Sequence, residues 1–491
     1  MAASRNVADV IVVGGGNAAL CAALAASDRG RSVVLLERAA EGEHGGNSYY
    51  TAGATRIVHN GLDDLRDFIE PDERHDRTVV PPYSRDDYLN DLAKVTGGRS
   101  DRRMGEILAD DSASTLRWLH KQHRVRYRLM YERQAYERPD GSFLFWGGLH
   151  VGNVGGGEGL IADEIAAAER AGIDIRYEHA ALDLLQEDEH VVGVVVETPH
   201  GVRELRSESV ILAAGGFESN AQLRQKFLGD GWQHAKVRGT PHNTGELIMK
   251  ALELGAAQGG DWSTCHSVQW DAWNEDNESN RELTNRLTRQ SYILGIIVNK
   301  DGARFVDEGA DFRNYTYAKY GAEVLRQPDS IAFQLFDATQ RPMLRAEEYE
   351  MPGISEVSAD SLEELADELG VAREQLVQTV ASFNDSIDRS KAFDPNVKDG
   401  RAAKLSPPKS HWANPIETAP FYAHPVTCGS TFTFGGLRGD EDARVLREDG
   451  TPIPGLFACG EALGGLFSGN YPGGSGLAAG AVFGRRAGST A

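Results

Sequence analysis

The stretch Val10-Ile11-Val12-Val13-Gly14-Gly15-Gly16-Asn17-Ala18-Ala19 decides the fold of this chain. Its leading run of β-branched, apolar residues predicts a short strand that is buried on both faces of a parallel sheet. In the G-x-G-x-x-A turn that follows, Gly14 permits the tight turn, Gly16 lets the backbone approach a pyrophosphate, and Ala19 lets a helix pack closely on the strand. A helix of small residues, Leu20 to Ala26, then offers unpaired amides to phosphate.

A second predicted strand, Ser32 to Leu36, ends at Glu37, whose carboxylate can accept hydrogen bonds from an adenosine ribose. Strand, turn, helix, strand and terminal acid in this order predict a dinucleotide site, against the alternative of an ordinary strand and turn. The glycine-rich loop from Glu41 to Arg56 either turns the chain or lines the rest of the cofactor with its amides and Ser48. We favour the second interpretation.

Length and composition bound the class of function. A chain of 491 residues exceeds one ordinary core, so two domains are expected. A net charge of −22 opposes binding to nucleic acid or to an anionic membrane surface, so an anionic substrate would need a local cluster of Arg. The 4 cysteines form no C-x-x-C pair, which indicates neither a disulfide framework nor a metal site. The sequence shows no apolar signal core and no membrane span, so we expect a cytoplasmic protein.

A second glycine pattern, Gly157-Glu158-Gly159-Leu160-Ile161-Ala162, also matches G-x-G-x-x-A. A helix and the strand Ile173 to Tyr177 follow it, which allows a second nucleotide site, for NAD. Glu158, however, would place a carboxylate where phosphates must lie. We therefore favour a loop that faces a flavin or the substrate.

The remaining pattern predicts helices around sheets. Leu62 to Gln134 mixes charged and apolar residues at helical spacing and is expected to cover the core. Amphipathic helices are expected at Ser361 to Leu369 and at Ala372 to Ser386. Expected strands are Ile173 to Tyr177, Ala181 to Gln186, Val191 to Glu197 and Val202 to Leu205, which form a small β-layer, then Ser209 to Phe217, Ile293 to Val298 and Ala303 to Glu308.

Residues that carry chemistry begin at His266. A lone His near aromatic residues is more often a satisfied structural residue, so His266 alone proves little. Further on, the charges from Arg304 to Arg313 allow two interpretations. They form ion pairs on a solvated face, or a buried Arg lies beside Glu308 and Asp311 and exchanges protons over a cofactor. Position alone does not decide between them.

The last pattern runs from Cys459-Gly460-Glu461 to Asn470-Tyr471-Pro472-Gly473-Gly474-Ser475-Gly476-Leu477. A helix that opens near Ser475 would aim its positive end at the negative charge on the pyrimidine side of a reduced flavin. The alternative is a glycine-rich turn before a packed helix of small residues. That alternative leaves the N-terminal site without its second half.

These pieces, in this order, resemble the flavoprotein family of fumarate reductases and succinate dehydrogenases, which includes 3-ketosteroid Δ1-dehydrogenases and tricarballylate dehydrogenase. Its most specific parts are the N-terminal turn, Ala213-Ala214-Gly215-Gly216, the segment from Asp301-Gly302 to Glu308, and Cys459-Gly460-Glu461. The stretch from Arg304 to Tyr317 is most similar to FAD-dependent tricarballylate dehydrogenase. The resemblance implies an α/β fold: a Rossmann-like FAD-binding domain, residues 1–262 and 424–491, interrupted by a smaller α+β capping domain, residues 263–423.

The resemblance also implies roles for single residues. Arg313 matches the Arg that donates the proton in fumarate reductases, although it lies one residue further from Glu308. Glu308 or Asp311 could provide its proton outlet, and Tyr315 and Tyr317 are the alternatives to Arg313 for the proton transfer. His266 matches the His that grips a substrate carboxylate. Phe432 stands where the family has a His, and Tyr471 replaces a carboxylate-gripping Arg. Ketosteroid dehydrogenases carry a Tyr there, whose hydroxyl bonds a ketone.

The function implied is FAD-dependent dehydrogenation of a CH–CH bond in a small polycarboxylate such as tricarballylate. The alternatives are a ketosteroid-type or other enone-forming enzyme, and a flavin-binding protein without redox activity. The expected electron acceptor is a partner protein or a quinone-linked carrier. We expect non-covalent FAD, because Asn47 precedes Ser48 where members that attach FAD carry a His. The expected FAD contacts are Gly14, Gly16, Asn17, Ala18, Glu37, Arg38, Gly46, Asn47, Ser48, Gly53, Ala214, Gly215, Gly460, Glu461, Ser475, Gly476 and Leu477.

Overall fold

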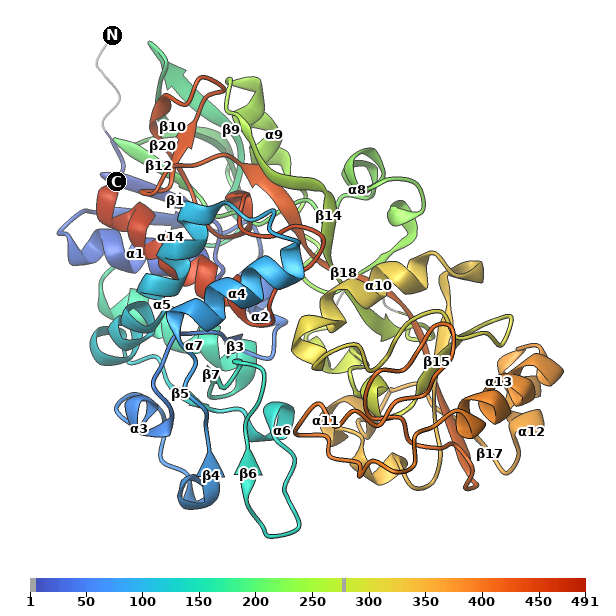
Figure 1. Ribbon diagram of the computed structural model, residues 1–491. Helices are drawn as coiled ribbons and strands as arrows, with labels where there is room; N and C mark the ends of the chain where they lie inside the picture. The colour runs from blue at the N-terminus through green and yellow to red at the C-terminus, as the bar shows by residue number, and fades with distance from the viewer. Residues whose placement is uncertain (1–5, 276–279) are drawn as a thin grey trace.

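The computed structural model describes residues 6–275 and 280–491 and shows two lobes (Figure 1). The first lobe contains a six-stranded sheet with the order β19-β20-β12-β1-β2-β8. β1 (Val10–Val13) pairs in parallel with both β2 (Val33–Leu36) and β12 (Ser209–Leu212), and all three strands are buried along their whole length, as the sequence predicts. β20 (Pro452–Ala458) extends the parallel ladder and β19 (Arg444–Leu446) closes it in the antiparallel sense.

The expected small β-layer is real but loses its first strand. β9 (Ala180–Glu187), β10 (His190–Thr198) and β11 (Gly201–Arg206) form an antiparallel sheet. The strand before them, β8 (Asp174–Arg176), pairs in parallel with β2 instead. The helix α7 (Gly156–Arg170) precedes β8. A helical crossover of this kind brings the chain back to the sheet as a strand that is parallel to its neighbour. This connection corrects the predicted layer.

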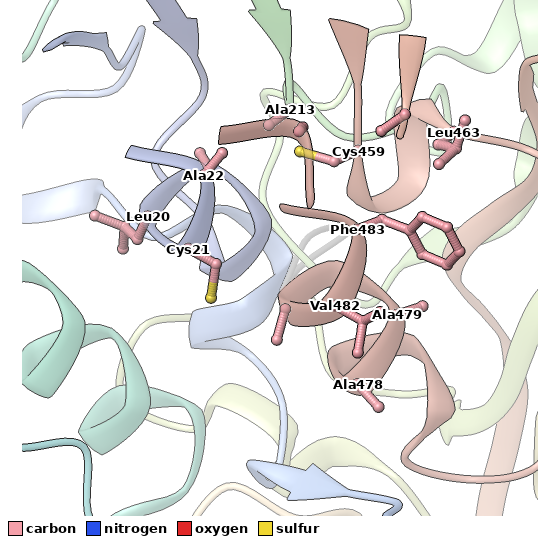
Figure 2. Close-up of a cluster of buried hydrophobic side chains, with 14 of the residues drawn as sticks. Leu20, Cys21, Ala22, Ala213, Cys459, Leu463, Ala478, Ala479, Val482 and Phe483 are labelled. Carbon is pink, nitrogen blue, oxygen red and sulfur yellow. The ribbon is translucent and has the colours of Figure 1, made fainter. Parts of the chain in front are cut away.

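Two helices from opposite ends of the chain lie side by side against the main sheet. α1 (Asn17–Asp28) and α14 (Ser475–Thr490) place Cys21 and Ala22 beside Ala478 and Val482 in one buried cluster (Figure 2). A Cβ at Gly484 would collide with the carbonyl oxygen of Ala18, and one at Gly488 with that of Ala22. The contacts advance in the same direction along both helices, so the helices run parallel and begin at the same edge of the sheet.

The second lobe is built on a sheet with the order β13-β18-β16-β15, to which β14 and β17 add through β18. The helices α12 (Leu362–Leu369) and α13 (Arg373–Asp385) confirm the two amphipathic helices predicted for this part of the chain. The strands are β13 (Lys236–Val237), β14 (Gln258–Asp271), β15 (Ile296–Asn299), β16 (Ala332–Phe336), β17 (Val357–Ala359) and β18 (Phe421–Leu437).

The expected strand Ala303 to Glu308 is irregular, which corrects the prediction. Arg304 makes one isolated bridge to Val298, and the chain then curls so that Arg304 Nε lies 3.0 Å from Glu308 Oε1. Residues four apart in a strand are about 13 Å apart, so this ion pair is incompatible with an extended segment. The preceding strand is also shorter than expected, because a 3₁₀ turn occupies Ser291–Leu294.

The long strands β14 and β18 pair in antiparallel fashion and run between the two lobes (Figure 1). The register places His266 opposite Phe432, with irregularities on both sides of this pair. The domain boundaries implied at 262/263 and 423/424 fall inside these two strands. The division into an FAD domain and a cap stays a prediction, and it places His266 at the joint.

Helices cover the first lobe where the sequence predicts them. The largest are α4 (Arg85–Thr96) and α5 (Arg102–His123). Short strands and one-turn helices precede and follow them. Within residues 6–275 and 280–491, none of the helices combines the length and apolar character needed to span a bilayer.

Candidate active site

The helix α1 begins at a cavity with free backbone amides. Gly16 precedes it without a side-chain cap, and its first turn contains no acid. Asn17 N donates to Ser48 Oγ at 3.1 Å, which binds the Gly46 to Ser48 loop to the helix start. Gly14 has a φ of +117°, and a Cβ there would collide with the carbonyl of Ala213. The positive helix end and open glycine turn are suited to a pyrophosphate.

Glu37 lies at the end of β2 and lines the same cavity. Its carboxyl Oε1 accepts a hydrogen bond from the backbone N of Ala39 at 2.8 Å, and a Cβ on Gly15 would collide with Oε2. The carboxyl group therefore lies directly against the glycine turn. Burial raises its pKa above the ordinary value for Glu. Hydroxyl donors of a ribose would stabilise its charged form.

The helix α14 supplies a second positive end. Gly474, with a φ of +83°, precedes it without a side-chain cap, and no acid occupies its first turn. Gly476 and Leu477 line the cavity that α1 also faces. A Cβ on Gly474 would collide with the Leu149 side chain, so only glycine fits this turn. The backbone amides of the two uncapped helix ends can donate hydrogen bonds, and the Glu37 carboxylate can accept them from a ribose. Together these groups fit FAD.

The structure brings most of the predicted FAD contacts to this cavity. Gly53 is an exception, because it packs against the backbone of Gly156. Ser475 is the other, since its Oγ accepts from the Tyr88 hydroxyl at 3.2 Å and does not line the cavity. The predicted residues that do line it are Gly14, Gly16, Asn17, Ala18, Glu37, Arg38, Gly46, Asn47, Ser48, Ala214, Gly215, Gly460, Glu461, Gly476 and Leu477.

The second glycine pattern serves packing. A Cβ at Gly157 would collide with the carbonyl oxygen of Ser48, and one at Gly159 with that of Val154. Glu158 stands in the first turn of α7, where a phosphate would have to bind. Gly157 packs α7 against the cofactor loop, and neither glycine lines the cavity, so this placement matches neither a second nucleotide site nor the favoured loop that faces a flavin or the substrate.

His266 faces the cavity from β14. The residue is 1% exposed, and neither ring nitrogen has a hydrogen-bond partner among the described residues. Its ring centroid lies 5.2 Å from Tyr317, 5.2 Å from Phe432 and 4.8 Å from Tyr471. Burial lowers its pKa well below the ordinary value, so the imidazole is neutral. A neutral imidazole can donate one hydrogen bond and accept another.

Two hydroxyl groups meet beside His266. The Tyr317 and Tyr471 hydroxyls hydrogen bond to each other, and both residues line the cavity. Burial raises the pKa of Tyr471 well above its ordinary value. Tyr315 is placed differently: its hydroxyl donates to Asp91 Oδ2 at 2.5 Å and lies 2.8 Å from the Gly147 carbonyl oxygen, outside the lining.

Arg313 lines the cavity with a guanidinium that has only neutral partners. It donates to Gln290 Oε1 and to the backbone oxygen of Arg133, while its Nε has no partner among the described residues. Burial, with the neighbouring Arg345 second, lowers the pKa of Arg313 to about 9. This Arg is therefore far closer to losing a proton at neutral pH than an ordinary one.

The two acids expected beside Arg313 lie elsewhere. Glu308 is buried away from the cavity lining, where it bonds Arg304 and the backbone N of Ile297, the latter at 2.8 Å. Asp311 pairs with Lys94 and lies 3.5 Å from Lys398. The curled segment from Arg304 to Glu308 turns both carboxylates away, so the expected proton outlet through them lacks the contact it needs.

Other charged residues of the cavity were missed in the sequence. Arg133 and Arg238 line it, and Arg345 lies close enough to depress the pKa of Arg313. Arg133 forms ion pairs with Glu347 at 2.7 Å and Glu348 at 3.1 Å. Arg238 bonds only the neutral oxygens of Asn285 and Thr431. No local motif marks these residues, because they converge only through the fold.

Fold and site together define a dinucleotide-dependent oxidoreductase: a parallel sheet with two open helix ends on one side of a cavity, and buried cations on the other. A family model described as "FAD binding domain" matches residues 9–477, so the chain belongs to that family. It is an FAD-dependent dehydrogenase or reductase, as predicted.

Similar proteins confirm the resemblance to fumarate reductase flavoproteins. The chain is 29% identical to the probable fumarate reductase Ifc3 of Shewanella frigidimarina, over 100% of this chain and 76% of the relative. It is 28% identical to the 3-oxosteroid 1-dehydrogenase of Mycolicibacterium smegmatis, over 95% and 93% of the two chains. The solved open conformation of a flavocytochrome c3 fumarate reductase superposes with a TM-score of 0.74 at 27% identity, covering 99% and 78%. The predicted α/β flavoprotein fold is confirmed.

Proposed function

We propose that this protein uses FAD to move two hydrogens between adjacent carbons of a small anionic substrate, a polycarboxylate in the simplest case. The carrying observation is a set of polar groups on the cavity wall: His266 and Arg313 Nε have no hydrogen-bond partner among the described residues, and the guanidinium of Arg238 bonds neutral oxygens. Bound FAD supplies the acceptor for a hydride. The relatives named for fumarate and for 3-oxosteroids both support a CH–CH reaction.

The balance of buried charge favours an anion. The guanidiniums of Arg133, Arg238, Arg313 and Arg345 lie close enough to affect the pKa values of their neighbours at this end of the cavity. Among the described residues, the carboxylates of Glu347 and Glu348 both pair with Arg133. This leaves a surplus of two positive charges among these groups. Buried charges without counterions are costly, so a dicarboxylate entering here would gain two charge-assisted hydrogen bonds.

The residues then take separate roles. Arg313 accepts the proton from one carbon in dehydrogenation, or donates it in reduction, because its lowered pKa makes both forms accessible. Neutral His266 hydrogen bonds a substrate oxygen and orients the carbon that exchanges hydride. Arg238 binds a carboxylate. The packed cavity walls exclude water from the proton on Arg313.

A ketone substrate is the second candidate. The hydroxyl pair of Tyr317 and Tyr471 can donate a hydrogen bond to a carbonyl oxygen, and three Phe rings line the cavity beside it. Phe432 lies 5.3 Å from Phe434 and 5.9 Å from Phe467, which forms an apolar wall. In this version the hydroxyls polarise the carbonyl and acidify the neighbouring C–H. The surplus of positive charge on the buried arginines has no counterpart in a neutral steroid, so the ketone is the second candidate.

The remaining parts of the proposal concern the cofactor and electron acceptor. FAD is held without a covalent bond, since Asn47 stands before Ser48 and donates to Glu218 Oε1 at 2.6 Å. Electrons leave to a partner protein or a quinone-linked carrier. The packing contacts of the second glycine pattern support an acceptor other than a nucleotide bound there.

An anaerobic substrate panel tests the reaction. The reconstituted FAD protein is mixed with tricarballylate, succinate, a cyclic oxo-acid and a ketosteroid, and flavin absorbance is followed. Bleaching by an acid with formation of an alkene product supports the proposal. Bleaching by the neutral ketosteroid alone selects the second candidate, and no bleaching together with no oxidation of chemically reduced flavin by the matching alkenes refutes both.

A further inference from the structure

Two acidic side chains meet beside the cofactor half of the cavity. Glu218 follows the glycine turn after β12 and is fully buried, and Glu461 lines the cavity in the turn after β20. Their carboxyl groups lie within reach of a hydrogen bond to each other, provided that one of them carries a proton. A Cβ on Gly216 would collide with Glu461 Oε1, so the Glu461 carboxyl group lies against the backbone of the turn that carries Glu218.

The contacts of this pair connect loops that are far apart in the sequence. Glu218 Oε1 accepts from the Nδ2 atoms of Asn47 and Asn243, each at 2.6 Å. Glu461 Oε1 accepts from the backbone N of Thr433 at 2.6 Å and from its hydroxyl at 3.1 Å. Glu218 Oε2 is buried and has no hydrogen-bond partner among the described residues, so a proton on one of the two carboxyl groups would satisfy it.

A hydrogen bond between two carboxyl groups requires a proton on one of them, because ionised carboxylates only accept. No cation replaces that proton: neither acid takes part in an ion pair of the described residues. Arg224 approaches, but its guanidinium donates to the backbone oxygen of Glu218. Cys265 is a further titratable group that faces Glu218.

Burial raises the pKa of both Glu218 and Glu461, and for Glu461 the charge of Glu218 raises it further. Like charges at one site cannot both ionise easily, which is the reason that paired carboxyls retain a proton. The pair therefore titrates as a unit in the direction of higher pH.

We propose that Glu218 and Glu461 share one proton, and that this proton holds together the loops that contact FAD. While it is present, Glu218 positions Asn47 and Asn243, and Glu461 is fixed on Thr433 at the cavity wall. When it is lost, two adjacent negative charges repel and the loops separate. Glu218 is a positioning residue in this account, since it acts through its neighbours. The inference rests on FAD binding and not on the proposed substrate.

The sign of the pH effect follows directly. The shared proton is bound at low pH, so FAD affinity is full there and falls as pH rises through the pKa of the pair. By linkage, one proton that is held more tightly in the FAD complex makes Kd rise by up to ~10-fold per pH unit above that point.

The experiment titrates apo-protein with FAD between pH ~6.5 and ~9.5, a window that extends above the ordinary carboxyl range. Fluorescence quenching gives Kd for the wild type, Glu218→Gln and Glu164→Gln. The amide introduced by Glu218→Gln mimics the protonated acid, because its nitrogen donates to Glu461 at every pH and its oxygen still accepts from both Asn residues. Glu164 is a matched control: it is a fully buried acid of the same lobe that lies outside the cavity lining.

We expect Kd to rise with pH in the wild type and in Glu164→Gln, and to stay flat in Glu218→Gln with wild-type affinity at neutral pH. Infrared difference spectra should show one protonated carboxyl band lost in Glu218→Gln. Equal pH profiles for wild type and Glu218→Gln, or no lost band, would overturn the proposal. If Glu218→Gln does not fold, a wild-type Kd that is constant across the window overturns it equally.

Discussion

If Arg313 takes the substrate proton, as proposed above, its lowered pKa should make the rate of flavin reduction steeply pH-dependent. Removing a substrate proton requires the neutral guanidine, and with a pKa of about 9 roughly one Arg313 in ~100 is neutral at pH 7. The rate of anaerobic flavin bleaching should therefore rise ~10-fold per unit between pH 7 and 8 and level off above about 9. The reverse reaction needs the protonated form, so alkene reduction should hold its rate below about 9 and lose it above.

The assay is stopped-flow absorbance at saturating substrate, so that binding does not contribute to the profile. Arg313→Gln keeps a hydrogen-bonding side chain but no basic group, and kcat should fall by ~10²-fold or more, the usual scale for a general acid or base. Glu308→Gln is the comparison variant. Because Glu308 lies outside the cavity lining, this change should not cause the same loss of kcat. A flat profile in the wild type, or near-normal turnover of Arg313→Gln, would refute the assignment and favour Tyr317.

Three further outcomes are expected. Acid precipitation should release the yellow cofactor into the supernatant, whereas colour in the pellet would show a covalent link. Glu37→Ala removes a charge-assisted hydrogen bond of about 1.5–3 kcal/mol, so the Kd for FAD should rise ~10-fold or more; an unchanged Kd in a fluorescence titration would make Glu37 a mere wall residue. His266→Ala should raise KM and leave kcat nearly constant in steady-state kinetics, as loss of uniform binding does. A large loss of kcat with constant KM would give His266 a role in the chemical step.

The cofactor half of the site is predictable because a short stretch of sequence determines each of its parts. Gly14, Gly16 and Glu37 occupy fixed places in a strand, turn, helix and strand, and backbone sterics allow few alternatives there. The start of α14 is marked in the same way by Gly474 and the small residues after it. The structure places these segments around one cavity, although α1 begins at Asn17 rather than Leu20 and Gly53 and Ser475 lie outside the lining.

The substrate half of the site could not be predicted from the sequence, because its residues come together only in the folded chain. Arg133 lies in the one-turn helix α6 (Tyr131–Gln134) and Arg238 follows a two-residue strand, and no sequence motif near either residue indicates a cavity. Glu308 was expected beside Arg313 because few residues separate them. The ion pair with Arg304 curls the chain instead and buries that carboxylate elsewhere. Sequence distance is a poor guide to contact in an irregular segment.

One binding measurement tests the central claim, that a cationic cavity beside FAD receives an anionic substrate. The flavin absorbance of the reconstituted protein is titrated with a saturated dicarboxylate and, separately, with its diamide of the same shape. Each charge-assisted hydrogen bond is worth about 1.5–3 kcal/mol, so the dicarboxylate should bind ~10-fold or more tightly than the diamide. Arg238→Gln should shrink that difference. Equal affinities, or tighter binding of the diamide, would contradict the account.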